Sequence, residues 1–139
     1  PIKSSAASDV YKRQVMVGPS SSHTAGAARI GFVARNLLGE DVKEARILLY
    51  GSFLATGKGH GTDKALVAGL LGMSPDDGRI ADSLRIAEEK KVGIEFGEAR
   101  LKEGHPNTVE LKLKGVSGKK LDIIGVLAQI PIQQQMHQA

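Results

Sequence analysis

Four hydroxyl side chains and one imidazole occupy five consecutive positions near the start of this chain. They follow the turn-forming pair Gly18 and Pro19, and in order they are Ser20, Ser21, Ser22, His23 and Thr24. An apolar pattern of helical period begins directly after them, so one of the serines is expected to cap a helix. Backbone N–H groups at a helix N-terminus lack intrahelical partners and the dipole is positive there, which predicts a pocket for a carboxylate or a phosphate. The competing interpretation is a helix cap with spare serines.

A glycine-rich loop at positions 56–63 is the second candidate. Its sequence is Thr-Gly-Lys-Gly-His-Gly-Thr-Asp, and it leads into another helical pattern that Thr62 or Asp63 is expected to cap. Glycines spaced by two let backbone N–H groups approach an anion, while Lys58 and His60 project from the loop. The spacing differs from the Walker A motif and from the dinucleotide-binding fingerprint. The residues expected to bind an anion are Lys58, Gly59, Gly61 and Thr62, and the competing interpretation is a flexible connector.

A third histidine stands in the turn at positions 104–108, where His105 and Asn107 precede a strand and are further candidates for anion binding. Alone, this turn is weak evidence, because Pro and Asn are common turn formers. Together, the three loops predict one polar site at an edge of the domain. His23 and His60 are the expected catalytic acid and base, because imidazole titrates closest to neutral pH. Which of the two has which role stays open, and the spacing predicts no metal site.

The periodicity of the remaining chain predicts the elements that position these loops. Helical patterns cover 25–38, 63–71 and 80–91, and strand patterns cover 42–51, 92–98, 108–113 and 120–126. A hairpin turn is expected at 115–118. Because three strands gather at one end of the sequence, we predict an α+β fold: helix, strand, helices, then three strands, forming a mixed sheet with helices packed on one face.

Length and composition indicate one globular domain and exclude several functions. The 139 residues suffice for a single core. The net charge of +4 is dispersed among acids and aromatics make up only 4%, so nucleic acid is not an expected partner. No apolar run of about 18 residues and no signal-peptide pattern is present, so a soluble, cytoplasmic protein is expected. There is no cysteine, so an iron–sulfur cluster would have to be held by another chain.

The two ends differ from the middle of the chain. Residues 1–14 show neither period and resemble translated cloning or adaptor sequence, so we expect a flexible leader that is not native. Residues 15–126 form the expected domain. The tail at 127–139 is rich in glutamine and is expected to fray.

The motifs at 18–24, 50–63 and 105–108 resemble those of the β chain of bacterial iron–sulfur-dependent L-serine dehydratase, also called L-serine deaminase, across 15–126. The resemblance implies conversion of L-serine into pyruvate and ammonia. It implies a [4Fe-4S] cluster carried by a cysteine-bearing α chain, without which this chain is inactive, and a homo- or hetero-oligomer. The leader and the glutamine-rich tail depart from the family pattern.

The same resemblance extends to the anion-binding regulatory domain of some D-3-phosphoglycerate dehydrogenases. It therefore leaves an alternative open, in which the chain is a non-catalytic module that binds an anion or an amino acid. His23 and His60 favour the lyase, because a carboxylate sensor needs N–H groups and a cation but no titrating imidazole. A pyridoxal-phosphate lyase is excluded, since it would require a larger two-domain fold.

Overall fold

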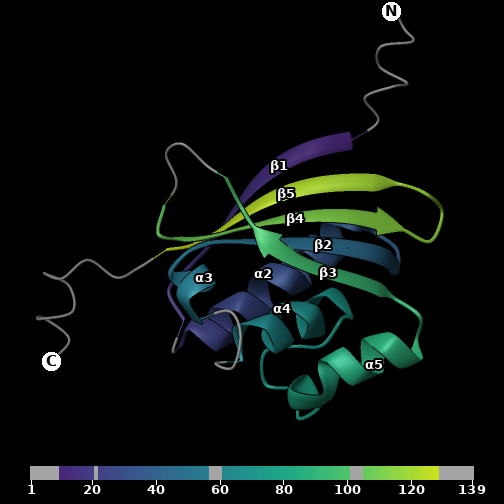
Figure 1. Ribbon diagram of the computed structural model, residues 1–139, viewed down its shortest axis with the longest axis horizontal. Helices are drawn as coiled ribbons and strands as arrows, with labels where there is room; N and C mark the ends of the chain where they lie inside the picture. Colours follow the sequence, from purple (N-terminus) through teal and green to yellow (C-terminus); the bar gives the residue numbers. More distant parts are fainter. Residues whose placement is uncertain (1–9, 21, 57–60, 101–104, 129–139) are drawn as a thin grey trace, which may run out of the picture.

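The protein is a mixed sheet with helices over one face, as predicted, but the sheet has five strands where the sequence predicted four (Figure 1). The computed structural model describes residues 10–20, 22–56, 61–100 and 105–128. The strands are β1 (Val10–Val17), β2 (Val42–Gly51), β3 (Gly93–Glu98), β4 (Asn107–Gly115) and β5 (Lys120–Leu127). The helices are α2 (His23–Leu38), α3 (Ser52–Thr56), α4 (Thr62–Leu70), α5 (Ser83–Glu89) and the 3-10 turn η1 (Ile80–Asp82). No helix in the described ranges is long and apolar enough to span a membrane.

The strands lie in the order β1, β5, β4, β2 and β3. The inner strand β4 runs antiparallel to both of its neighbours, whereas the edge strands β1 and β3 run parallel to β5 and β2. The predicted hairpin between β4 and β5 is confirmed: Gly118 adopts a φ of +94° and donates its N–H to the carbonyl of Gly115 at 2.9 Å. Because consecutive side chains of a strand point to opposite faces, one face of this sheet is apolar and the other is mostly polar.

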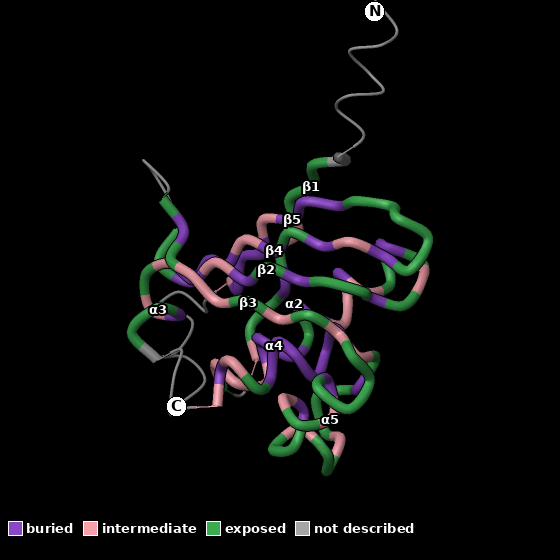
Figure 2. Tube along the Cα trace, turned by 45° about the vertical axis from the view of Figure 1, so that its right-hand side comes forward, coloured by how far each residue is buried: buried purple, intermediate pink, exposed green. Residues whose placement is uncertain are grey.

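The core lies between the sheet and the helices α2 and α4, and it is aliphatic. Figure 2 shows buried stretches along α4 and along the central strands. The strands contribute alternate residues, among them Ala45, Ile47 and Leu49 of β2 and Val109, Leu111 and Leu113 of β4. Phe53 is the one aromatic residue among the buried hydrophobic residues of the described chain. The low aromatic content is thus matched by a core of small and branched side chains.

Helices α2 and α4 approach each other closely because glycines stand at their crossing. A Cβ on Gly31 would overlap the carbonyl oxygen of Leu66, and a Cβ on Gly69 would overlap that of Ala28. Gly61, which precedes α4, lies beside Thr24 in the first turn of α2, so the N-termini of both helices lie at the same end of the domain.

Four details differ from the sequence-based expectations. Residues 10–14, assigned to a leader, belong to β1, because this stretch completes the backbone hydrogen bonding of β5. Leu127, assigned to the tail, ends β5, and residues 129–139 lie outside the described residues. The third helix begins as a 3-10 turn and is shorter than expected. The fourth difference is α3, a helix of five residues within the segment that was expected to be a loop.

Candidate functional site

The three motifs at 18–24, 50–63 and 105–108 meet where α2, α3 and β4 begin. His23 Nε2 lies 3.0 Å from Oδ1 of Asn107, and the hydroxyl of Ser52 donates to the same Oδ1 atom. His23, Ser52 and Asn107 come from three segments that are far apart in sequence, and each is the first residue of its element. The fold therefore places one polar residue from each motif in a single hydrogen-bonded cluster.

The serine-rich motif opens α2 as predicted, with Ser22 as its N-cap. Ser22 has extended backbone angles, and its Oγ accepts the N–H of Ala25 at 3.1 Å. Its hydroxyl hydrogen remains able to donate, as do the other first-turn N–H groups, which have no intrahelical acceptor. Arg29 Nη1 lies 3.5 Å from the hydroxyl of Ser20, so a guanidinium stands beside the positive end of the helix. This charge distribution favours an anionic ligand. Ser21 lies outside the described residues.

The glycine-rich motif reaches the first turn of α2 through Gly61. A Cβ on Gly61 would lie 3.7 Å from Thr24 Oγ1, which is ordinary van der Waals distance. Gly61 is also the N-cap of α4, with a φ of +88°, in place of the Thr62 or Asp63 cap predicted from the sequence. A left-handed residue is needed at this corner, which explains why glycine and not a capping side chain stands here. Thr62 follows as a buried residue. Lys58, Gly59 and His60 lie outside the described residues, so their expected roles stay predictions.

The third motif is held against the second by a backbone hydrogen bond, in which the N–H of Ser52 donates to the carbonyl of Pro106 at 2.7 Å. Within the third motif, the N–H of Asn107 donates to Nδ1 of His105 at 3.1 Å. His105 is exposed, whereas Asn107 is completely buried. Burial of Asn107 favours a supporting role for its side chain over direct contact with a ligand, while the exposure of His105 is compatible with anion binding.

Sequence reasoning did not select two residues of the cluster, Ser52 and Phe53. The ring of Phe53 packs edge-on against the imidazole of His23, with centroids 5.5 Å apart and planes at 70°. Both residues follow a buried strand that ends at Gly51, and this position was the available signal, because binding and catalytic residues often lie in the segments that connect regular elements. The signal was missed because the segment was expected to be a loop, and a short helix instead turns Ser52 and Phe53 toward α2.

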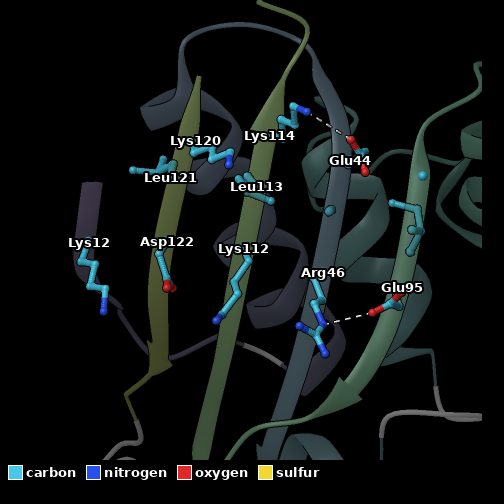
Figure 3. A pocket seen from close by; sticks show the side chains of 13 residues that line it. Lys12, Glu44, Arg46, Glu95, Lys112, Leu113, Lys114, Lys120, Leu121 and Asp122 are labelled. Carbon is cyan, nitrogen blue, oxygen red and sulfur yellow. Dashed lines mark ion pairs between the residues drawn. The ribbon is translucent and has the colours of Figure 1, made fainter. Parts of the chain in front are cut away.

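A cavity of about 590 Å³ lies elsewhere, on the sheet face opposite the helices (Figure 3). Five of its eight charged lining residues form a row across all five strands in register: Lys12, Asp122, Lys112, Arg46 and Glu95. Arg46 and Glu95 form an exposed ion pair at 3.0 Å, and such pairs contribute little to stability. None of the residues singled out from the sequence lines this cavity. We therefore place the candidate site at the three motifs, where titratable and hydrogen-bonding groups converge.

Comparison with known proteins points in one direction. A family model described as serine dehydratase beta chain matches residues 7–123. The probable L-serine dehydratase beta chain of Bacillus subtilis (strain 168) is 47% identical over 81% of this chain and 50% of its own length. The L-serine dehydratase beta chain of Peptoniphilus asaccharolyticus is 43% identical over 80% of this chain and 50% of its own length. L-serine dehydratase 2 of Escherichia coli (strain K12) is 46% identical over 49% of this chain and 16% of its own. The chain thus spans about half the length of the two beta chains.

Proposed function

Because this chain belongs to the serine dehydratase β-chain family, we propose that it is the part of an L-serine dehydratase that binds the substrate carboxylate and transfers protons. The reaction converts L-serine into pyruvate and ammonia. The observation that carries the proposal is the contact between His23 and Asn107, which places an imidazole from the first motif beside the third motif at the N-terminus of α2.

The reaction requires loss of the α-proton and of the β-hydroxyl group of serine, which leaves as water. The resulting aminoacrylate tautomerises to an imine by gaining a proton at its β carbon and losing one from nitrogen, and water then hydrolyses the imine to pyruvate and ammonia. The first-turn N–H groups of α2, with the hydroxyls of Ser22 and Thr24, are suited to the carboxylate. The side chain of His23 is suited to the transfer of one of the protons, and His60 is the expected second proton-transfer residue.

The iron–sulfur cluster that the resemblance implies is assigned in this proposal to a partner α chain. The 139 residues contain no cysteine, and no group of three or more His, Asp or Glu in the described ranges is arranged to hold a metal ion. The residues present therefore do not fit a [4Fe-4S] cluster, and we propose that a cysteine-bearing α chain holds it. When bound there, the cluster would supply Lewis acidity for departure of the hydroxyl group.

Co-expression with a cysteine-bearing serine dehydratase α chain tests this proposal. Pyruvate formation from L-serine is measured for the reconstituted pair and for each chain alone under anaerobic conditions. We expect activity and iron–sulfur absorbance in the pair, and neither of them in the isolated β chain. If the α chain alone were fully active and this chain only made it sensitive to anions, the regulatory alternative would replace the proposal.

A further inference from the structure

Asn107 carries a side-chain amide into the interior of the candidate site. The residue is completely buried, and burial of an amide costs free energy unless its polar atoms are paired. Its Oδ1 contacts His23 Nε2 and accepts from the hydroxyl of Ser52, while its Nδ2 donates to the carbonyl oxygen of Leu127 at 3.4 Å. The amide thus connects α2, α3 and the end of β5, and both of its polar atoms are used.

The orientation of this amide follows from Leu127. A backbone carbonyl can only accept a hydrogen bond, so the NH₂ group of Asn107 must face it. The reverse orientation would set two acceptor oxygens against each other with no hydrogen between them. With Nδ2 directed to Leu127, the oxygen Oδ1 is the atom that faces His23.

The orientation of the amide in turn decides the protonation of the imidazole. Because Oδ1 accepts and never donates, the nitrogen that lies 3.0 Å from it must carry hydrogen, and that nitrogen is Nε2 of His23. In a neutral imidazole the lone pair is then on Nδ1. Among the described residues Nδ1 has no hydrogen-bond partner, and the edge-on contact with Phe53 restricts rotation of the ring. The unpaired nitrogen is therefore held in a fixed direction.

We infer that Asn107 is a positioning residue that holds His23 in the Nε2–H tautomer and so makes Nδ1 the nitrogen that exchanges a proton with the substrate. The tautomer follows from the hydrogen bonds alone. The exchange with substrate rests on the proposed function.

Nuclear magnetic resonance of the ¹⁵N-labelled 139-residue chain tests the tautomer without any need for activity. Long-range proton–nitrogen correlations distinguish the two neutral forms of each imidazole, and the His23→Gln variant identifies the signals of His23. We expect protonated Nε2, unprotonated Nδ1, and an Nε2–H resonance that is protected from solvent exchange. A His23 ring protonated at Nδ1 in the unmodified chain would overturn the inference, whatever the variants do.

Two variants separate positioning from packing. Asn107→Leu removes the acceptor, so the protected Nε2–H resonance should be lost; its persistence in a folded Asn107→Leu chain would also overturn the inference. Ser52→Ala is the matched control, because it removes the other donor to Oδ1 and should leave the resonance in place. In the pair with the α chain, Asn107→Leu should lower kcat about 10- to 100-fold, the range typical of hydrogen-bond partners that orient metal-binding histidines, with a smaller change in KM.

The spectra and the turnover measurements test the tautomer and the proposed function separately. If the spectra show the Nε2–H tautomer but the reconstituted pair makes no pyruvate, the proposed function is wrong and the positioning of His23 stands. If the pair is active and Asn107→Leu folds with kcat unchanged, Asn107 has no role in the reaction.

Discussion

The carbonyl oxygen of Pro106 accepts the backbone N–H of Ser52 at a distance of 2.7 Å. This bond joins the second motif to the third and fixes the residue directly before Asn107. Gly51 makes it possible, since its φ is +62° and a Cβ at this position would overlap the same carbonyl oxygen. The geometry of the cluster thus depends on a glycine that contacts no ligand in the proposal.

Replacement of Gly51 by alanine should therefore be strongly destabilising. The positive φ costs a non-glycine residue about 1–2 kcal/mol, and overlap with a backbone atom adds about 1–3 kcal/mol. Gly39→Ala is the control, because Gly39 has a φ of +80° with no atom within 4 Å of its would-be Cβ. Urea unfolding of both variants measures the difference, and equal losses would show that the contact with Pro106 is unimportant.

The crossing of α2 and α4 gives a second prediction. Gly→Ala inside a helix normally stabilises by about 1 kcal/mol. For Gly69 the sign should be reversed, because the added Cβ would meet the backbone of Ala28 and of Phe32, and overpacking costs about 1–3 kcal/mol. In Gly26→Ala the three nearest atoms all belong to the side chain of Leu127, which can shift more easily than backbone. Thermal unfolding should rank Gly69→Ala well below Gly26→Ala, and the opposite order would contradict close packing at this crossing.

Much of the fold follows from local sequence. The range of β2, the N-cap at Ser22 and the hairpin at Gly118 were predictable, because apolar period, capping preference and glycine conformation act over a few residues. The strand β1 was not predictable, since its polar residues gain their structure by pairing with β5, which is more than 100 residues away in sequence.

The candidate site was predictable in part for the same reason. His23 and Asn107 were selected by residue type, and the structure joins them by a direct contact. The arrangement of the cluster, in which the buried Asn107 contacts both His23 and Ser52, depends on the tertiary approach of Gly51 to Pro106. No local pattern reports such an approach.

Stability should depend on pH through Glu110, on the sheet face opposite the helices. Burial, and then the hydrogen bond and charge of Asp122, raise the pKa of Glu110 above its usual value of 4.5. The folded state therefore binds this proton more tightly than the unfolded state, and stability falls as pH rises above 4.5 toward the raised folded pKa. At neutral pH the ionised side chain then lowers the free energy of unfolding.

Glu110→Gln should raise the Tm at pH 7, and the advantage should vanish well below pH 4.5, where Glu110 is protonated in both states. Glu95→Gln is the control, because Glu95 is exposed and paired with Arg46 at 3.0 Å, so its removal should not raise the Tm. Melting curves of both variants, measured from well below pH 4.5 to pH 7, test this expectation. If Glu110→Gln is no more stable than the original chain at pH 7, then ionised Glu110 beside Asp122 does not lower the free energy of unfolding.

His23→Ala is the variant that most directly tests the proposed chemistry. Folding should suffer little: Oδ1 of Asn107 keeps the hydroxyl of Ser52 as a donor, so the loss is about 1–2 kcal/mol from one hydrogen bond and one aromatic contact. Turnover in the pair with the α chain should fall by about 10²–10⁴ in kcat, as for loss of a general acid or base. Thermal melts together with pyruvate formation separate the effects. Near-normal turnover would remove His23 from proton transfer, whereas joint loss of turnover and folding would make its role structural.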